Sequence, residues 1–253
     1  MITLDTIGSI IDEFTDNYGL KVGIEYRLPA PIASTSVYDR LWSELVRVHP
    51  WHKHPKQILD SARSVIVFAI PLSYSAVKSN EESSEPSVQW LREYILTNKL
   101  IEEVAKYISS VLRSSGYRSL GLKPTHNYKP DSLVSEWSHR HAGYVCGLGT
   151  FGLNNLLITS KGCAVRLGTV ITEAEVEVSE KPRYEYCLER RGVKCKICIK
   201  RCPIRALDNW SYGRFKCSER LSKIALKYIG IIGEYADACG KCCTGVPCAT
   251  GIP

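Results

Sequence analysis

The chain has 253 residues, of which 44% are hydrophobic and 23% are charged, and its formal net charge is +7. This composition is that of an ordinary globular protein and excludes the disordered, collagen-like and coiled-coil classes. No apolar run reaches the ~18 residues that cross a bilayer, and the N-terminus lacks the pattern of a secretory signal. We therefore expect a cytoplasmic protein without a membrane partner.

The first 180 residues predict a mixed α/β region. In chain order, the expected elements are a helix over residues 4–19, strands over 21–26 and 62–70, helices over 88–115 and 133–146, and strands over 156–159 and 165–172. The run over 62–70 is rich in β-branched residues and ends at Pro71, which is typical of a central strand buried on both faces.

The remainder of the chain differs in cysteine content and in charge. Nine of the 11 cysteines lie in residues 187–253, and Cys146 and Cys163 stand apart from them. Residues 181–253 hold 15 Lys or Arg and 6 Asp or Glu, whereas residues 1–180 hold 18 and 20. Both changes predict a domain boundary near Lys181 and two domains, 1–180 and 181–253.

The cysteine spacing predicts iron–sulfur clusters. Cys195-x2-Cys198-x3-Cys202-Pro203 matches the second half of the bacterial ferredoxin run, whose last cysteine ligates the other cluster. Cys239-x2-Cys242 repeats the theme in a shorter form. The crossover assigns Cys187, Cys195, Cys198 and Cys248 to one [4Fe–4S] cluster, and Cys202, Cys217, Cys239 and Cys242 to a second.

Three alternatives accompany this assignment. Seven residues separate Cys187 from Cys195, so a first cluster with three cysteine ligands is possible, and Cys243 is expected to be the spare thiol. Zinc bound by two CxxC pairs is the rival metal, but it leaves Cys217 unused. Disulfides are disfavoured because nothing indicates secretion.

The segment from Gly147 to Gly152 matches G-x-G-x-x-G. A dinucleotide fingerprint needs a strand before it and a helix after it. Here a helix-like stretch precedes the glycines and a strand-like stretch follows them, so nicotinamide binding is rejected. The glycines still indicate close backbone approach, either to a ligand or to a neighbouring element.

Three stretches resemble the epoxyqueuosine reductases and the related cobalamin-dependent reductive dehalogenases. They are the strand 62–67 shortly after His54-Pro55; the glycine segment with residues 154–158 and 166–168; and the order Cys195, Cys198, Cys202-Pro203, Cys217, Cys239, Cys242. The resemblance covers most of the chain. It implies an α+β protein in which a nitroreductase-like, cobalamin-binding α/β domain precedes a ferredoxin-like domain with two [4Fe–4S] clusters.

The resemblance also implies site residues. The expected cofactor-binding residues are Gly147, Leu148, Gly149, Thr150, Phe151, Gly152, Asn154 and Arg166. Asp131 is the nearest counterpart of the family's catalytic aspartate, and Tyr128, Glu136 and His139 are further candidate proton donors. His126, Tyr128 and Asp131 lie in a proline-rich loop from which polar groups could reach a substrate.

The leading functional prediction is therefore an iron–sulfur, cobalamin-dependent oxidoreductase. A low-potential electron donor of the ferredoxin or flavodoxin type is the expected partner, and tRNA is a possible one. The alternatives are an electron-transfer or corrinoid-reducing protein without its own organic substrate, and a nitroreductase-like enzyme that uses FMN. The sequence names neither the substrate nor the oligomeric state.

Overall fold

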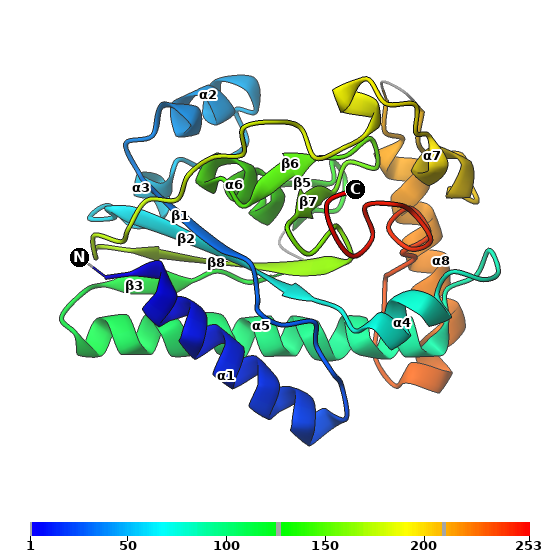
Figure 1. The fold of residues 1–253 in the computed structure, drawn as a ribbon, viewed down its shortest axis with the longest axis horizontal. Helices are drawn as coiled ribbons and strands as arrows, with labels where there is room; N and C mark the ends of the chain where they lie inside the picture. The colour runs from blue at the N-terminus through cyan, green and yellow to red at the C-terminus, as the bar shows by residue number, and fades with distance from the viewer. Residues whose placement is uncertain (1, 125–127, 209–210) are drawn as a thin grey trace.

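The computed structural model describes residues 2–124, 128–208 and 211–253. Its elements are α1 (Leu4–Val22), β1 (Ile32–Ser36), α2 (Arg40–Val48), α3 (Pro55–Ile58), β2 (Ser64–Pro71), α4 (Tyr74–Ser79), α5 (Val88–Ser114), β3 (Ser119–Gly121), β4 (Tyr128–Lys129), β5 (Val134–Ser135), α6 (His139–Cys146), β6 (Gly149–Phe151), β7 (Leu157–Thr159), β8 (Val165–Thr172), a short 3-10 helix (Glu189–Arg191), α7 (Ile197–Arg201) and α8 (Arg214–Ile232). Helices α1 and α5 lie on one side of the main sheet and α2, α3 and α6 on the other, while α7 and α8 stand at one end (Figure 1). The chain is thus a mixed α/β protein with small sheets.

The main sheet is antiparallel, in the order β1-β2-β8-β3. All eight residues of β2 are buried. Because successive side chains of a strand point to opposite faces, Ile66, Phe68 and Ile70 pack into the core beneath α1 and α5. The alternate residues of β2 pack into the core on the α6 side. The predicted central strand, buried on both faces, is confirmed.

Helix α5 and strand β8 also agree with the sequence patterns. Helix α5 has 27 residues and begins at Ser87, whose side chain accepts a hydrogen bond from the Trp90 N–H. Its buried residues recur at helical spacing and face the sheet. Strand β8 has the predicted bounds of 165–172, and β7 begins one residue later than predicted.

Two sequence predictions are wrong. No strand forms over 21–26, because α1 continues to Val22 and ends only at Gly23, which adopts the left-handed conformation with φ 72°. The helix predicted over 133–146 begins only at His139. Ser138 caps that helix, while Leu133 has a positive φ and Val134–Ser135 forms β5.

The cysteine-rich region has little apolar core of its own. Between residues 188 and 235, the described residues with buried side chains are Ala206, Leu207, Ile224 and Ala225. A third core joins this region to α5 and β7 through Trp90, Ile158 and Ile224, among others. No helix in the described part of the chain is long and apolar enough to cross a membrane.

Candidate metal and cofactor site

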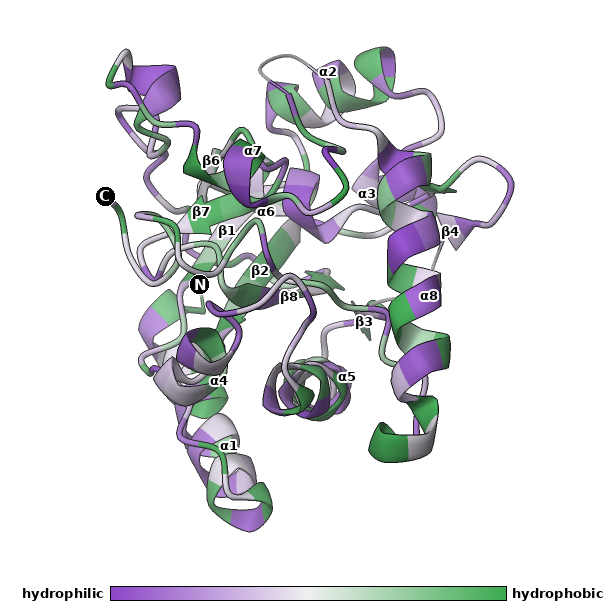
Figure 2. Cartoon of the chain, turned by 90° about the vertical axis from the view of Figure 1, so that its right-hand side faces the viewer, coloured by the Kyte–Doolittle hydropathy of each residue, from purple (hydrophilic) through white to green (hydrophobic). Residues whose placement is uncertain are grey.

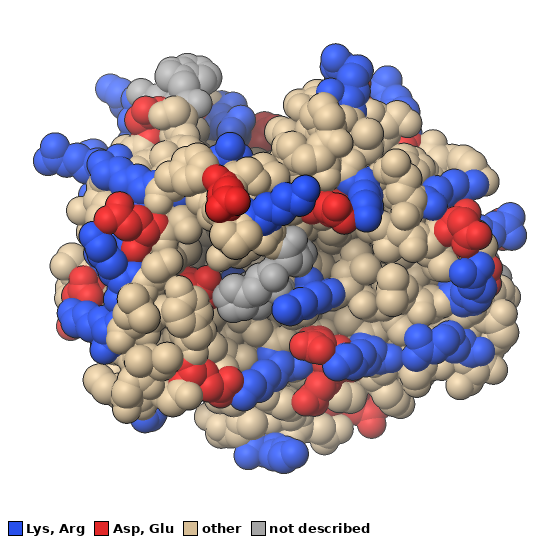
Figure 3. Space-filling view, turned by 180° about the vertical axis from the view of Figure 1, so that it is seen from behind, with Lys and Arg blue, Asp and Glu red and all other residues tan. Residues whose placement is uncertain are grey.

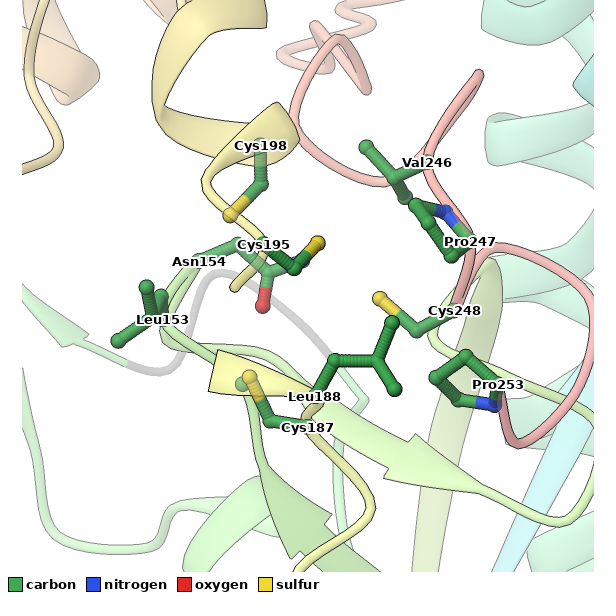
Figure 4. Close-up of a pocket in the computed structure, with 11 residues that line it drawn as sticks. Leu153, Asn154, Cys187, Leu188, Cys195, Cys198, Val246, Pro247, Cys248 and Pro253 are labelled. Atoms are coloured by element: carbon green, nitrogen blue, oxygen red, sulfur yellow. The ribbon is translucent and has the colours of Figure 1, made fainter. Parts of the chain in front are cut away.

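Four cysteines from three segments line one pocket. Cys187 precedes the short 3-10 helix, Cys195 lies two residues before α7, Cys198 lies in its first turn, and Cys248 lies near the C-terminus. Figure 4 shows these side chains around one space, with the thiols of Cys187 and Cys248 directed into it. Burial raises the pKa of Cys198 to about 12, and the thiols of Cys248, Cys242 and Cys187 add to this effect. We call these four residues the first set.

The surroundings of the first set are mostly apolar. The other residues that line the pocket are Gly152, Leu153, Asn154, Leu188, Val246, Pro247 and Pro253. None of them carries a positive charge. Glu189 fixes the loop between Cys187 and Cys195, because its Oε2 accepts a hydrogen bond of 2.7 Å from the Cys195 N–H. The 3-10 helix Glu189–Arg191 lies within the loop between these two cysteines, and both line the same pocket despite their long separation in sequence.

The other four predicted ligands also gather, and we call them the second set. The thiol of Cys217, on α8, interacts electrostatically with those of Cys242, Cys239 and Cys202. Burial raises the pKa of Cys217, and a hydrogen bond from Tyr212 opposes that shift. Within the described residues, neither set nor any other group of three or more Cys, His, Asp or Glu side chains is arranged so that it could hold a metal ion.

Donors and cations surround the second set. The Ala206 N–H lies 3.2 Å from the Cys202 Sγ, and Arg220 Nε lies 3.3 Å from the Cys239 Sγ. Such contacts stabilise negative charge on sulfur. Lys241, beside Cys242, is 2% exposed and donates from Nζ to the carbonyl oxygens of Asn80 and Glu82.

Arg140 adds a further cation and connects the second set to the main sheet. Burial lowers the pKa of Arg140, whose guanidinium interacts electrostatically with Tyr212, Arg166, Cys242 and Cys217. Arg166 lies on β8, donates from Nε to the Asn98 Oδ1 at 2.9 Å, and stacks over the ring of Tyr94. The predicted cofactor residue Arg166 therefore lies in a polar region between the sheet and the second set.

Asn154 bridges the two sets. It is buried, it lines the pocket of the first set, and its Nδ2 donates a hydrogen bond of 2.9 Å to the carbonyl oxygen of Cys242. This predicted cofactor-binding residue thus lies within the cysteine cluster region.

The remaining glycine segment packs against neighbouring chain segments. Gly147 ends α6 in the left-handed conformation with φ 87°. A Cβ on Gly149 would lie 2.0 Å from the Ile158 carbonyl oxygen, and one on Gly152 would lie 2.5 Å from the Asn154 Oδ1. Contacts within the chain therefore account for these glycines. As the sequence indicated, a helix precedes this segment and strands follow it.

The other side chains of this segment are partly or fully enclosed. Leu148 and Thr150 are buried, and the Thr150 Oγ1 accepts a hydrogen bond of 2.7 Å from the Tyr186 N–H. The ring of Phe151 contacts His141 and Tyr144, with centroids 5.2 and 5.7 Å apart. Cofactor binding by residues 147–152 stays a prediction.

Two of the candidate proton donors lie on or beside the hairpin formed by β4 and β5. Asp131 is exposed in the turn between these strands. Tyr128 is 39% exposed, and burial and the nearby Asp237 and Tyr235 raise its pKa. His126 lies outside the described residues.

The other two candidates are engaged elsewhere. The ring of His139 contacts Thr169 Oγ1 through Nδ1 at 2.7 Å and the Lys123 carbonyl oxygen through Nε2 at 2.9 Å. Glu136 is exposed and forms a salt bridge of 2.6 Å with Lys53, which lowers the pKa of its carboxyl group. The structure does not bring all four candidates to one site.

Sequence reasoning missed Arg140 and Arg220 as neighbours of the second set. Arg220 lies three residues after Cys217 on α8, a helix that was not predicted. The spacing of Ile224, Tyr228 and Ile232, followed directly by Gly233, was a usable signal for that helix. Nothing local to Arg140 indicated its approach to Cys242, about 100 residues later.

Comparison with solved structures shows the same fold in two enzyme groups. An epoxyqueuosine reductase bound to an epoxyqueuosine-modified tRNA stem loop matches with a TM-score of 0.55 and 18% identity over 96% of this chain. The epoxyqueuosine reductase of Bacillus subtilis, solved with a catalytic loop swung out of its active site, matches with a TM-score of 0.54 and 15% identity over 97% of this chain. A reductive dehalogenase described as B12-dependent matches with a TM-score of 0.55 and 16% identity over 89%.

These matches confirm, at the level of the fold, the resemblance that the sequence indicated. The chain spans 66% and 67% of the two reductases and 30% of the dehalogenase. No family model matches the sequence, and no curated protein matches it either.

Proposed function

We propose that this chain is an iron–sulfur, corrinoid-dependent reductase in which the two cysteine sets hold [4Fe–4S] clusters. The observation that carries the proposal is the pocket lined by Cys187, Cys195, Cys198 and Cys248. Four thiols directed around one space, from segments up to 61 residues apart, are the donor set of such a cluster. On this proposal the chain has two parts, a nitroreductase-like part over 1–180 and a ferredoxin-like part over 181–253.

The chain's own residues would tune the two clusters differently. Arg220 and the Ala206 N–H donate to sulfurs of the second set, with Arg140 and Lys241 nearby. The pocket of the first set is lined by apolar side chains and by Asn154. Because cations and donors near sulfur stabilise the reduced state, the second cluster would have the higher reduction potential.

We infer the corrinoid from the similarity between this fold and that of a related structure. A related structure is described as that of a B12-dependent dehalogenase. A bound corrinoid would supply a low-potential, nucleophilic metal centre. The residues that we assign to corrinoid binding are Arg166 and Arg140, which lie where the main sheet meets the second set.

For the proton, we propose Asp131, with Tyr128 as the second candidate. Both lie at the β4–β5 hairpin and are at least partly accessible, whereas His139 and Glu136 are held by other contacts. In the Bacillus subtilis reductase a catalytic loop swings out of the active site. An exposed hairpin turn would allow Asp131 a comparable approach to substrate.

We propose that the electron donor docks on the outer face of α8. A groove there is lined by Glu85, Ile204, Lys216, Glu219, Arg220, Lys223, Ile224 and Lys227. Arg220 connects this groove directly to Cys239. Figure 2 shows hydrophilic and hydrophobic residues alternating along α8, and the apolar residues that line the groove are Ile204 and Ile224. A basic rim with apolar contacts suits an acidic ferredoxin or flavodoxin.

An epoxyqueuosine-containing tRNA is the proposed substrate to test first. A related structure holds such a tRNA stem loop. On the rear face of this molecule, basic and acidic side chains are interspersed and do not form one continuous basic strip (Figure 3). Substrate recognition would therefore depend on local contacts more than on a large positive field.

The test is the spectrum of protein purified without oxygen. Broad absorption near 400 nm and about eight irons per chain are expected. Added corrinoid should bind and change its spectrum on reduction, and reduced, loaded protein should convert epoxyqueuosine-containing tRNA. Binding of FMN alone, or zinc in place of iron, would contradict the proposal. Reduction of the bound corrinoid without turnover of any tRNA would favour the role of a corrinoid-reducing protein.

A further inference from the structure

Cys163 is a buried thiol outside both sets, and it touches one of their members. It lies between β7 and β8 and is 3% exposed. Its Sγ lies 3.9 Å from the Sγ of Cys248, which is within range of a hydrogen bond between sulfurs. The two residues are 85 positions apart in the chain.

The backbone around Cys163 is fixed against the C-terminal segment. The Cys163 N–H donates to the Cys248 carbonyl oxygen, and the Ala164 N–H donates to that of Ala249, both at 2.9 Å. Gly162 has φ 81°, and a Cβ there would lie 2.4 Å from the Ala249 carbonyl oxygen. Only glycine permits this approach, which sets the position of the next residue.

A buried arginine holds the same two segments together. Arg27 is 6% exposed, and its Nη1 donates to the carbonyl oxygens of Lys161 and Thr250 at 3.0 and 3.1 Å. Its Nη2 donates to the Ala164 carbonyl oxygen at 3.1 Å. Arg27 and the backbone hydrogen bonds therefore fix the segments that carry Cys163 and Cys248 against each other.

The direction of the sulfur hydrogen bond follows from the proposed ligation of Cys248 to the first cluster. Asn154 Nδ2 lies 3.6 Å from the Cys163 Sγ and donates to it. A ligand thiolate can only accept hydrogen bonds, so a cluster-bound Cys248 leaves the S–H of Cys163 as the donor between the two sulfurs. The three residues form a chain from the amide of Asn154 through Cys163 to Cys248.

We propose that Cys163 is a positioning residue that donates an S–H···S hydrogen bond to the Cys248 thiolate and raises the reduction potential of the first cluster. This inference rests on the proposed function, in which the first set holds a [4Fe–4S] cluster. The hydrogen bond offsets part of the negative charge that reduction adds to the cluster sulfurs. The residues that line the pocket of the first set carry no positive charge, so no cation among them stabilises negative charge on these sulfurs.

The experiment compares Cys163→Ala and Cys163→Ser with the wild type by redox titration monitored by electron paramagnetic resonance. We expect Cys163→Ala to lower the equilibrium constant for reduction of the first cluster by roughly threefold to tenfold. A tenfold decrease corresponds to a reduction potential that is lower by about 59 mV for one electron. Cys163→Ser keeps a donor and should shift the potential less. The second cluster should be unchanged in both variants.

Cys146→Ala is the matched control. Cys146 is also a buried thiol, but its Sγ contacts the Val65 carbonyl oxygen in the core of the main sheet. Both cluster potentials should stay at the wild-type values in this variant. A shift as large as that of Cys163→Ala would mean that loss of any buried thiol changes the potential, and would overturn the inference.

Iron analysis separates failure of this inference from failure of the proposed function. A wild type without iron contradicts the proposed function itself. A wild type with about eight irons and an unchanged first potential in Cys163→Ala contradicts only the role of Cys163. Loss of about half the iron in that variant would instead make Cys163 a ligand, which also overturns the inference.

A measurement on the wild type covers the case in which the variants do not fold. After exchange into D₂O, the reduced first cluster should show a deuteron coupling from the Cys163 thiol in pulsed magnetic resonance spectra. Absence of any exchangeable proton near the first cluster, apart from backbone amides, would contradict the proposed hydrogen bond.

Discussion

The main sheet and the segment from 188 to 235 are stabilised in different ways. Strand β2 is buried along its whole length and divides two apolar cores. In contrast, Ala206, Leu207, Ile224 and Ala225 are the buried side chains described between residues 188 and 235. A segment of that size with so little apolar burial cannot hold its own fold. The difference teaches that the sheet is stabilised by hydrophobic burial, whereas on the proposed function the cysteine-rich segment would be stabilised by metal ligation as well as by the third core.

Of the changes considered, removal of iron should have the largest effect on structure, and it should unfold only the cysteine-rich segment. We expect chelated protein to become sensitive to trypsin between residues 190 and 227, where exposed basic residues are frequent, while residues 1–180 stay protected. The physical reason is that, on the proposed function, the clusters would cross-link segments that bury few apolar side chains of their own. Limited proteolysis with mass spectrometry, with and without chelator, checks this. Equal protection of both regions after iron loss would contradict the comparison.

Substitution of Asp131 should separate catalysis from metal binding. Asp131→Asn removes the proposed proton donor and should lower turnover of epoxyqueuosine-containing tRNA by roughly 10²- to 10⁴-fold, with iron content unchanged. Glu136→Gln is the control, because Glu136 is exposed and paired with Lys53. Steady-state turnover and iron analysis test both variants. Wild-type turnover in Asp131→Asn would remove this residue from the site.

Acid should destabilise the region of the main sheet through its histidines. Burial lowers the pKa of His52, His139 and His141 to about 4, from an ordinary value of 6.5. Above pH 6.5 these rings are neutral in both the folded and unfolded states. Between pH 6.5 and pH 4 the unfolded chain binds up to three more protons, so the free energy of unfolding falls as pH falls.

Urea unfolding of the iron-free protein at several pH values measures this effect. Each of the two buried rings, His52 and His139, contributes up to about 1.4 kcal/mol per pH unit, and the half-buried His141 contributes less. His139→Phe removes one titrating group and should make the pH dependence shallower, even if the variant is less stable overall. A free energy of unfolding that does not change between pH 6.5 and pH 4.5 would contradict the assignment.

Charge reversal on α8 should have the smallest effect of these changes. It should alter only the rate at which an external electron donor reduces the protein. Lys216→Glu combined with Lys223→Glu should slow reduction by an acidic ferredoxin by about tenfold at low salt, and by less at high salt. Lys21→Glu, on the exposed end of α1, is the control for a lysine outside the groove. Stopped-flow reduction at two ionic strengths checks this. Equal slowing by the α8 variant and the control would disprove the proposed docking face.

The parts of the fold that the sequence predicted have strong local patterns. The β-branched run of β2, the bounds of β8 and the apolar stripe of α5 were all readable, because burial on one or two faces imposes a period on the residues. The cysteine spacing likewise predicted two groups of four thiols; Cys187, Cys195, Cys198 and Cys248 line one pocket, and the division into two ligand sets stays a prediction.

Long-range contacts were not readable from the sequence. Cys163 meets Cys248, and Arg140 approaches Cys242, only because β7, β8 and α6 place them there. Such pairs have no period and no spacing rule. The strand expected over 21–26 failed for a related reason, since an alternating pattern of six residues did not outweigh continuation of α1 to its glycine cap.

The central claim is that the two cysteine sets hold two [4Fe–4S] clusters. Iron and sulfide analysis of protein purified without oxygen, together with magnetic resonance of the reduced sample, tests it most directly. The account predicts about eight irons per chain, and reduced signals from two clusters with different potentials, the lower belonging to the set with Cys248. About four irons, one cluster signal, or zinc in place of iron would contradict it.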